Sequence, residues 1–450
     1  MTFSISETLG FLDNPNLPWK SIIVGFTVGQ FLFETYLGYR QYQVLQKTSL
    51  PSTIKQEVPK ETFDKSQDYS RAKQRFAFIS DGYSLVKNLL FIKYDVLPKF
   101  WSFGGSILKT VAPYLPKFMG GIITQSIFFV FVLSIFSNLT SLPVDYYQTF
   151  VLEEKYGFNK STIGLWITDQ LKSLALSFVL LPPVLAGILK IIDTFGQSFI
   201  LYLSGFVLVT QLVLMTIYPS LIQPLFNKFT PLEDGELKDA IEDLARKQQF
   251  PLTKLYVIDG SKRSGHSNAY FTGLPWSKQI VLFDTLIEQS TVDETVAVLA
   301  HEIGHWNLNH LPQMLLFSQL NVSFMFSIFA AFVNNNSLYR SFGFATNPTM
   351  VGLILFSDIF KPVESGLQFI QNLFIRKNEY EADEYAKTCG YTEDLGKSLI
   401  KLNVENLSYF EADWLYSAYH RSHPLLTERL EAIGYVSKEK VGLEKPEKQD

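Results

Sequence analysis

Cysteine and charged residues are scarce in this 450-residue chain. Cys389 is the single cysteine, so no internal disulfide can form. Only 18% of the residues are charged, below the roughly 25% of soluble domains. The formal net charge of -4 carries no basic excess, which predicts that nucleic acid is not a partner. The N-terminus lacks a basic region and a small-residue cleavage site, so we expect the first apolar run to be retained as a membrane span.

Apolar sequence is abundant, at 47% hydrophobic and 15% aromatic residues. It falls into long runs separated by basic polar stretches, a pattern typical of multi-pass helical membrane proteins. A spanning helix needs about 20 apolar residues. We predict seven spans, over residues 18–39, 85–111, 120–142, 163–192, 199–226, 311–333 and 350–375. The second is the weakest, because it is interrupted by Lys93, Asp95, Pro98 and Lys99.

The distribution of Lys and Arg predicts the orientation of these spans. Basic residues cluster after the first span (40–75), after the fifth (228–278) and in the tail after the seventh. The segment before the first span has none, and the connection after the sixth has only Arg340. Seven spans place every basic cluster on one side. Because positive residues favour the cytosolic side, we expect a lumenal N-terminus and a cytosolic tail.

Ionisable residues also occur inside the predicted spans. They are Glu34, Asp169, Lys172, Asp358, Lys361 and Glu364. A bare charge at the bilayer centre costs roughly 2.5–3.5 kcal/mol or more, so such groups usually face a bundle interior or water. Two interpretations stay open: the last three pair along one helix face, or the charges line a wet internal cavity.

The spans divide the chain into four segments. Residues 1–226 hold the first five membrane helices and their cytosolic loops, and 227–310 form a cytosolic segment that ends in a His-Glu-x-x-His helix. Residues 311–375 hold the last two membrane helices, and 376–450 form a cytosolic C-terminal segment. The predicted fold is mainly α, with a small β-hairpin in the segment 227–310.

The segment before the sixth span carries the pattern His301-Glu302-Ile303-Gly304-His305. Thr291 followed by Glu294 marks a helix start, so the two histidines lie one turn apart on one helix face. Two imidazoles on one face can bind a single Zn²⁺ ion. Glu302 beside them is placed to act as the catalytic base, taking a proton from metal-bound water.

A third metal ligand is expected downstream, within residues 378–384. Glu379 and Asp383 are four residues apart and share a helix face, so Glu379 can ligate while Asp383 orients a ligand histidine. Glu381 and Glu384 are rival ligands by chemistry alone. His310, at helical spacing from His305 and near the membrane boundary, reads as structural.

Two further segments admit both a structural and a functional interpretation. Residues 268–272 and the apolar run 280–283 predict a β-hairpin around Leu274-Pro275-Trp276. It is either purely structural or an edge strand that pairs with extended substrate. His423 precedes Pro424 at a helix start and Arg429 follows, which is compatible with a helix cap and a surface ion pair.

Together these motifs resemble the gluzincin metallopeptidases and, more closely, the type 1 CAAX prenyl proteases, which include the fungal a-factor-converting enzymes. The resemblance spans nearly the whole chain. It rests on residues 153–159 (EEKYGFN), 226–232 (FNKFTPL), 267–273 (SNAYFTG), 301–305 (HEIGH), 379–383, 422–424 (SHP) and Arg429. One departure is Ile375 before Arg376, where a serine is common in the family; neither residue is a ligand.

The resemblance implies a substrate and a fold that the residues alone do not give. Such enzymes remove the last three residues of proteins whose C-terminal cysteine is prenylated, and fungal members also cut a mating-pheromone precursor near its N-terminus. The family fold is a ring of seven long helices around a water-filled chamber, with zinc at its cytosolic end. The implied location is the endoplasmic reticulum membrane or the inner nuclear membrane, with lipid as a further partner.

The resemblance also assigns candidate roles. It favours Glu379 as third ligand and Asn268, Ala269 and Tyr270 as substrate-binding residues. His423 is expected to stabilise the oxyanion. Arg429 is expected to fix a glutamate ligand or the substrate carboxylate.

Two alternatives remain at this point. One keeps the chemistry but assigns quality control of membrane proteins, as bacterial relatives with the same motif perform. The other is a transporter or scaffold whose pathway is lined by the intramembrane charges; the intact ligands and Glu302 argue against it.

Overall fold

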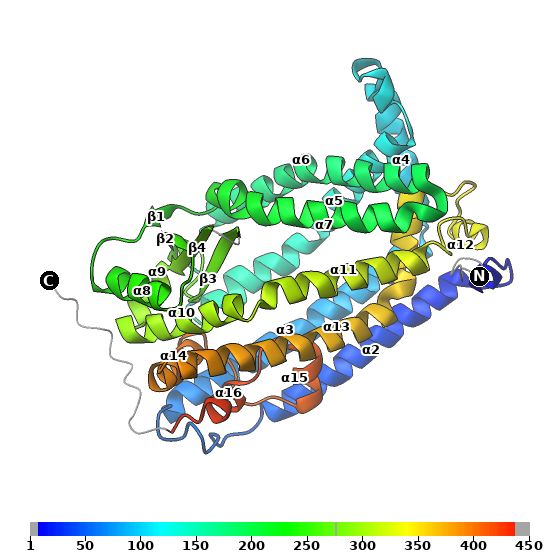
Figure 1. Ribbon diagram of the computed structural model, residues 1–450. Helices are drawn as coiled ribbons and strands as arrows, with labels where there is room; N and C mark the ends of the chain where they lie inside the picture. Colours follow the sequence, from blue (N-terminus) through cyan, green and yellow to red (C-terminus); the bar gives the residue numbers. More distant parts are fainter. Residues whose placement is uncertain (1–7, 275–276, 437–450) are drawn as a thin grey trace.

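The computed structural model describes residues 8–274 and 277–436. Long helices run the length of the molecule, while a small sheet and several short helices gather at one end (Figure 1). The long helices are α2 (Trp19–Val44), α3 (Lys60–Lys93), α5 (Ile122–Tyr147), α6 (Ile163–Phe195), α7 (Phe199–Ile217), α11 (His310–Phe329) and α13 (Thr349–Thr388).

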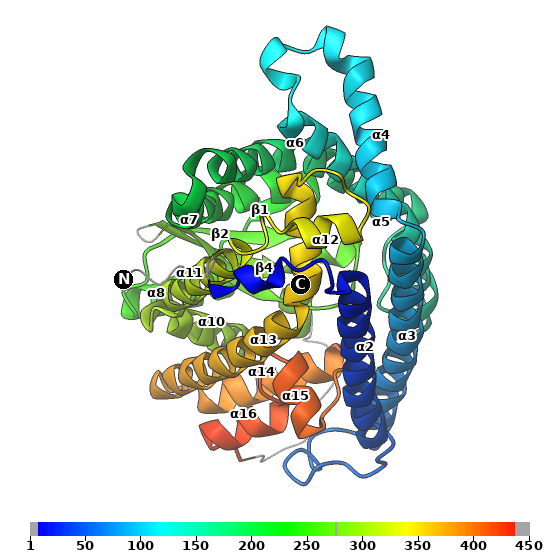
Figure 2. The same cartoon turned by 90° about the vertical axis from the view of Figure 1, so that its right-hand side faces the viewer.

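These long helices close into a ring. The helix α2 packs on α3, α5 on α6, α6 on α7, α7 on α11, α11 on α13, and α13 returns to α2. Between α3 and α5 the contact includes the hydroxyl of Tyr83, which donates to the carbonyl oxygen of Thr140 at 2.9 Å. Figure 2 looks along this ring from the end where α2 begins. The predicted mainly helical architecture, with long helices around a common axis, is confirmed.

Five helical segments within the described residues are long and apolar enough to cross a membrane. They are Trp19–Val44, Ile122–Glu153, Ile163–Phe195, Phe199–Leu225 and His310–Phe329. These coincide with the first, third, fourth, fifth and sixth predicted spans. The second of these segments ends in a π-helical turn, Gln148–Glu153, and the fourth contains one, Tyr218–Ile222, before a final 3-10 turn.

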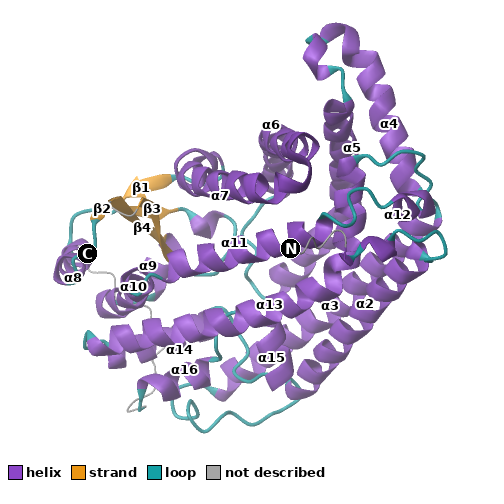
Figure 3. Cartoon of the chain, turned by 45° about the vertical axis from the view of Figure 1, so that its right-hand side comes forward, coloured by secondary structure: helices purple, strands orange, loops and turns teal. Residues whose placement is uncertain are grey.

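The second predicted span does not form one helix. The chain breaks between α3 and α4 (Val96–Val111), where Asp95 adopts a left-handed conformation with φ 48°. Aspartate tolerates this conformation better than most residues, and its carboxylate pairs with Lys20 at 2.5 Å. The span predicted over 85–111 is therefore divided between the end of α3 and α4, and the break falls at Asp95, one of the residues that interrupt the apolar run. The helix α4 and the start of α5 instead form a hairpin that stands out from the body (Figure 3).

The seventh predicted span belongs to a much longer helix. The helix α13 has 40 residues, about 60 Å at 1.5 Å per residue, and runs without interruption past residue 375. It therefore carries both the membrane portion and the segment with Glu379 and Asp383. Pro362 lies inside it, as helices within membrane bundles tolerate.

The sheet has four strands in the order β1-β2-β4-β3. They are β1 (Phe229–Pro231), β2 (Leu252–Ile258), β3 (Ala269–Leu274) and β4 (Ser277–Phe283). Strands β3 and β4 form the predicted antiparallel hairpin, with Ala269 opposite Leu282; Pro275 and Trp276 in its turn lie outside the described residues. Strand β4 also pairs with β2 in parallel, a strand that the hairpin prediction did not include. Strand β3 is thus an edge of the sheet.

Short helices surround the sheet and the site. They are α8 (Glu236–Lys247), α9 (Asp284–Gln289), α10 (Val292–Asn307), α12 (Asn336–Ser341), α14 (Thr392–Glu405), α15 (Trp414–His420) and α16 (Leu426–Ile433). The helix α10 packs against α8, β3, α13 and α14. Its start is the capping box of Thr291 and Glu294 that the sequence indicates. Its apolar residues Ala297, Leu299 and Ala300 are fully buried, which fixes the direction of the neighbouring histidines.

Candidate metal centre

Two helices bring the predicted ligands together. His301 and His305 lie one turn apart on α10, and Glu379 lies on α13, which packs directly against it. One donor atom from each of the three residues lies within 4.8 Å of the others. This is the one group of three or more His, Cys, Asp or Glu side chains with metal-binding geometry in the described part of the chain.

The close approach of α10 and α13 depends on Gly304. A Cβ atom at this position would lie 3.1 Å from Cβ of Tyr385 and 3.2 Å from both Cα and the carbonyl oxygen of Ala382. Any larger residue would push α13 away from α10. The glycine inside the motif therefore sets the distance between the two histidines and the glutamate.

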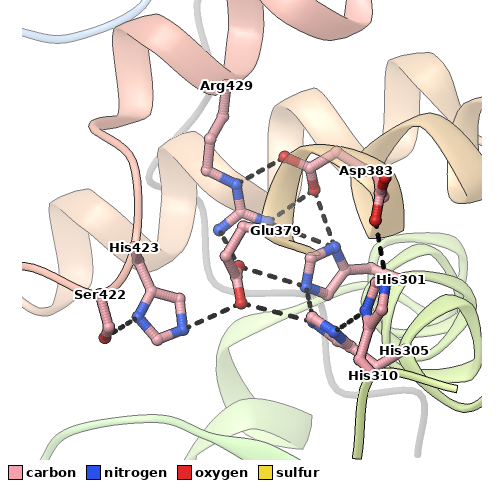
Figure 4. A network of polar contacts seen from close by, with 9 residues as sticks. His301, His305, His310, Glu379, Asp383, Ser422, His423 and Arg429 are labelled. Carbon is pink, nitrogen blue, oxygen red and sulfur yellow. Dashed lines mark hydrogen bonds and ion pairs between the residues drawn. The ribbon is translucent and has the colours of Figure 1, made fainter. Parts of the chain in front are cut away.

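The imidazole Nε2 atoms of His301 and His305 lie 3.1 Å apart, both aimed at Glu379 (Figure 4). Nε2 of His301 is 3.6 Å from one carboxylate oxygen of Glu379, and Nε2 of His305 is 3.4 Å from the other. Burial alone would raise the pKa of Glu379, but the hydrogen bond from His305 and the charge of His301 lower it to about 2. Glu379 is therefore an ionised carboxylate at neutral pH.

The side chains fit a bound metal ion. Oε2 of Glu379 is buried yet has no hydrogen-bond partner among the described residues. Such an atom is costly unless an ion or another ligand completes its coordination. Two imidazoles and one carboxylate are the ligand set of catalytic zinc sites, which keep a fourth position open. His301, His305 and Glu379 form the metal site.

Glu302 lines the same cavity, of about 290 Å³, beside the two histidines. Burial raises the pKa of this carboxyl above its ordinary value, and the imidazoles of His301 and His305 oppose that rise. Its carboxylate makes no hydrogen bond to any described residue. It is therefore available to exchange a proton with a molecule in the cavity.

Asp383 and Arg429 orient His301 through Nδ1, the ring nitrogen that does not face Glu379. Oδ1 of Asp383 lies 2.8 Å from Nδ1 of His301. Arg429 donates to both oxygens of the same carboxylate, at 2.7 Å and 2.6 Å, and its Nη1 lies 3.8 Å from Oε2 of Glu379. The sequence leaves open whether Arg429 contacts a ligand glutamate or the substrate; its strong bonds go to Asp383.

His423 enters the site from the loop between α15 and α16. Its Nε2 lies 3.3 Å from Oε1 of Glu379, and its Nδ1 is 3.0 Å from the hydroxyl oxygen of Ser422. More than half of its side chain is exposed, and it lines the cavity. The imidazole is thus open to an incoming molecule.

Asn268 and Ala269 line the cavity from the edge of the sheet. The carbonyl oxygen of Asn268 accepts from the N–H of Phe283 on β4, so its backbone faces into the sheet. The N–H of Ala269 donates to Oδ1 of Asn268 at 2.8 Å. Because strand residues alternate in direction, Ala269 and Phe271 present their backbone groups to the free edge. Tyr270, the third predicted substrate residue, accepts a hydrogen bond at its hydroxyl oxygen from Nε2 of Gln223 and lines a neighbouring cavity.

The rival glutamates point elsewhere. Glu381 lies 3.2 Å from Nε2 of His310, and Glu384 pairs with Lys387 at 2.9 Å on the outer surface. The sequence predicted His310 at helical spacing from His305, which is wrong. The helix α10 ends at Asn307, and a new helix begins at His310. Its contact with His305 was missed, since a break between two apolar helices has no strong sequence signal here.

The intramembrane charges mostly have partners. Asp358 pairs with Lys361 at 2.7 Å, as the paired interpretation predicts, but Glu364 is exposed and lies outside this pair. Asp169 accepts two hydrogen bonds from Arg263. A cavity of about 260 Å³, lined by both polar and apolar side chains, adjoins Asp358 and Lys361. Pairing and access to a cavity therefore occur together.

Comparison with known proteins covers the chain in two parts. Residues 41–228 match the family described as CAAX prenyl protease N-terminal, five membrane helices. Residues 231–437 match peptidase family M48. The first match shows a multi-pass integral membrane protein, and the second contains all residues of the metal centre.

Curated relatives match over nearly their full length. The chain is 51% identical to CAAX prenyl protease 1 of Saccharomyces cerevisiae, over 95% of this chain and 98% of the relative. It is 44% identical to probable CAAX prenyl protease 1 of Schizosaccharomyces pombe, over 97% and 93%. It is 40% identical to the human CAAX prenyl protease 1 homolog, over 90% and 92%.

The fold agrees with a solved structure as well. The crystal structure of S. mikatae Ste24p superposes with a TM-score of 0.88 at 51% identity, covering 93% of this chain and 100% of that chain. With this coverage, the agreement extends through the helical ring and the metal centre. The chain belongs to the CAAX prenyl protease 1 family, the membrane-embedded zinc metallopeptidases of family M48.

Proposed function

We propose that this chain is a zinc-dependent endopeptidase that removes the last three residues of prenylated CAAX proteins. The observation that carries the proposal is the placement of His301, His305, Glu379 and Glu302 around one cavity beside a free strand edge. Near full-length identity to CAAX prenyl protease 1 supports the substrate class. A second cleavage, near the N-terminus of a mating-pheromone precursor, stays a prediction for the same site. Family membership decides against the transporter or scaffold alternative.

His301, His305 and Glu379 would hold one Zn²⁺ ion, which when bound acts as a Lewis acid toward water and the scissile carbonyl. Glu302 takes the proton of the attacking water and delivers it to the nitrogen of the departing tripeptide. Its raised pKa suits both steps, because the group must accept and then release a proton. The peptide bond breaks without a covalent enzyme intermediate.

His423 is the group that we assign to the developing oxyanion. Its exposed imidazole stands at the mouth of the cavity and can donate a hydrogen bond to a negatively charged oxygen. The contact with Ser422 orients the ring. Arg429 acts indirectly: it binds the carboxylate of Asp383, which in turn orients His301.

The substrate backbone is proposed to pair with the free edge of β3. The backbone groups of Phe271 and the carbonyl oxygen of Ala269 face the free edge for this pairing, whereas the N–H of Ala269 is held by Oδ1 of Asn268. The side-chain amide of Asn268 can contact a substrate carbonyl through its NH₂ group. Strand pairing binds an extended peptide through its backbone, whatever its side chains are. This suits an enzyme whose substrates share only a short C-terminal motif.

An apolar cavity of about 680 Å³ supports a lipid-bearing substrate. It lies farther along the same strand, at Tyr270–Gly273, and its other walls come from α7 and α11. Leu214 and Met215 of α7 and Leu311 and Leu315 of α11 contribute apolar side chains. An isoprenoid of about 15 carbons gains about 0.8 kcal/mol for each methylene removed from water. A peptide on β3 could place its scissile bond at the metal and its lipid here.

Cleavage of matched peptides tests this function. Purified protein in detergent is given a farnesylated CAAX peptide and its unlipidated counterpart, and release of the tripeptide is followed by mass spectrometry. We expect cleavage of the farnesylated peptide and a much lower kcat/KM for the other. Equal cleavage of both would favour the quality-control alternative, and cleavage of neither would contradict the function.

For the location, we propose the endoplasmic reticulum or inner nuclear membrane, with the metal centre facing the cytosol. The start of α2 and the sheet lie at opposite ends of the helix ring, which supports a lumenal N-terminus opposite a cytosolic site (Figure 1). The basic residues of 228–278 gather at the sheet end, as the positive-inside bias requires.

Glycosylation can test this orientation at the α4–α5 hairpin, which we place in the lumen. Lys117→Asn together with Met119→Thr creates an acceptor site at its exposed tip, where Phe118 is 86% exposed. We expect an endoglycosidase-sensitive mobility shift. The natural acceptor sequence at Asn335 is unsuitable, because this side chain is 1% exposed and is bonded to Leu12. A glycan at Asn159 instead would contradict the proposed orientation, because that residue is expected on the cytosolic side.

A further inference from the structure

His310 contacts a metal ligand from the helix that follows it. The backbone of Asn309 adopts a left-handed conformation with φ 57°, which turns the chain between α10 and α11. This turn returns His310 toward α10, so that its Nδ1 lies 2.8 Å from Nδ1 of His305 (Figure 4). The ring of His310 is 3% exposed, and its Nε2 lies 3.2 Å from Oε2 of Glu381 on α13.

With a metal ion bound at Nε2 of His305, one pattern of protons is consistent. Nε2 faces Glu379 and the metal position and would bind the ion through its lone pair, so the proton of the neutral ring would reside on Nδ1. That N–H donates to Nδ1 of His310, which must then be an acceptor. The proton of His310 consequently lies on Nε2 and is donated to the carboxylate of Glu381. Each ring fixes the tautomer of the next.

We propose that His310 is a positioning residue for the metal ligand His305, and that Glu381 holds His310 in the tautomer this requires. The inference rests on the proposed metal centre. His301 and His305 would then be oriented by separate groups: Asp383 with Arg429 behind one, and His310 with Glu381 behind the other. Groups of this kind typically change metal affinity 10- to 100-fold when removed.

The position of Glu381 favours orientation over simple filling of space. Glu381 lies only two residues from Glu379, on the same helix, yet its carboxylate points to His310 and also pairs with Lys377 at 3.1 Å. The helix α13 therefore contacts both histidines of α10, one through Asp383 and one through Glu381 and His310.

Zinc affinity of purified protein, measured by competition with a chromogenic chelator, tests the proposal. We expect His310→Phe, which keeps a ring but no acceptor, to weaken zinc binding 10- to 100-fold. His310→Asn places a carbonyl oxygen near the position of Nδ1 and should restore affinity to within a few fold. The thermal midpoint of the zinc-free protein is measured alongside. Unchanged zinc affinity in His310→Phe, with a lowered midpoint, would show a structural role and overturn the proposal.

We call the chain of contacts from Glu381 through His310 to His305 the relay. A double-mutant cycle distinguishes an effect of Glu381 through this relay from an independent loss of stability. Glu381→Ala alone should weaken zinc binding, but should have no further effect in the His310→Phe background. Glu384→Ala, on the outer face of α13, is the matched control and should leave zinc affinity unchanged. Additive effects of the two variants would contradict the relay.

The same assay distinguishes failure of the relay from failure of the metal centre. Glu379→Ala removes a proposed ligand and should abolish tight zinc binding. If Glu379→Ala binds zinc normally, the metal centre is wrong. If it loses zinc while His310→Phe does not, the centre stands and the positioning role of His310 fails.

Discussion

Oδ1 of Asp383 lies 2.8 Å from Nδ1 of His301, one helical turn beyond Glu379 on the same helix. This contact leaves Nε2 of His301 free to face the metal position. Asp383 is completely buried, and its negative charge is matched by the guanidinium of Arg429. Burial alone would raise the pKa of Asp383, but hydrogen bonds from Arg429 and His301 lower it to about 2. The carboxylate stays ionised at neutral pH and holds the ligand ring in one orientation.

Asp383→Ala should lower zinc affinity by about 10- to 100-fold. It removes the acceptor for His301 and leaves the cation of Arg429 without its main partner. Leaving one half of a buried ion pair alone typically costs about 3–5 kcal/mol of stability, so the thermal midpoint should fall as well. Zinc competition and thermal unfolding measure the two effects.

Asp383→Asn is the informative control for this variant. An amide oxygen can still accept the proton of His301, but it carries no charge for Arg429. We expect a smaller loss of zinc affinity than in Asp383→Ala, with a similar loss of stability. Equal zinc affinity in all three proteins would show that Asp383 does not orient the ligand.

Glu302→Gln should reduce turnover by at least about 10²- to 10⁴-fold while zinc stays bound. The substitution keeps the size of the side chain and removes only its ability to carry the proton. Metal content by mass spectrometry and tripeptide release by chromatography measure the two properties. Asp293→Asn, at the exposed start of the same helix, should leave both unchanged. Near-normal turnover in Glu302→Gln would remove this residue from the mechanism.

Gly304→Ala should destabilise the protein, although alanine normally favours a helix over glycine by up to about 1 kcal/mol. The new Cβ would lie 3.2 Å from the backbone of Ala382, so α13 has to move by a few tenths of an ångström. Overpacking of this kind costs roughly 1–3 kcal/mol and would carry Glu379 away from the histidines. Thermal unfolding and zinc competition should both show the loss.

Gly366→Ala is the matched control, because a Cβ at this position in α13 meets no atom within 4 Å. It should be neutral or slightly stabilising. If Gly304→Ala behaves in the same way, contact between α10 and α13 tolerates the methyl group and does not set the ligand distance.

The metal centre was largely predictable because its geometry is local. The spacing of His301 and His305 fixes their shared helix face, and the spacing of Glu379 and Asp383 does the same on α13. Selecting Glu379 over Glu381 needed more than spacing, since both are acidic residues of one helix. The structure separates them by direction: Glu379 faces the two histidines and Glu381 faces His310.

Features that depend on breaks and on long-range packing were harder to predict. Single left-handed residues, Asp95 and Asn309, end one helix and start another, and aspartate and asparagine occur in many other conformations. The predicted span over 85–111 is divided into two helices at the first, and the contact of His310 was missed at the second. Strand β2 was overlooked because its parallel pairing with β4 crosses more than twenty residues of sequence.

The charges inside the membrane part allow a final test of the proposed chamber. Asp358 and Lys361 pair with each other on α13, and each keeps roughly a third of its side chain exposed. The cavity beside them is also lined by Thr27 of α2 and Lys87 of α3. A pair of charges in lipid would be costly, whereas a pair at the wall of a water-filled chamber would not. We therefore expect this face of α13 to be wet.

Cysteine labelling can measure the water accessibility of this helix face. In a Cys389→Ser background, Asp358→Cys and Lys361→Cys should react with a small, charged, membrane-impermeant thiol reagent. Val363→Cys is the control, because Val363 is 42% exposed but lies on the opposite face of the helix, where lipid is expected. It should react only with an apolar reagent. Protection of Asp358→Cys and Lys361→Cys from the charged reagent would mean that the helix bundle is dry at this depth, and the chamber would be disproved even if the zinc chemistry stood.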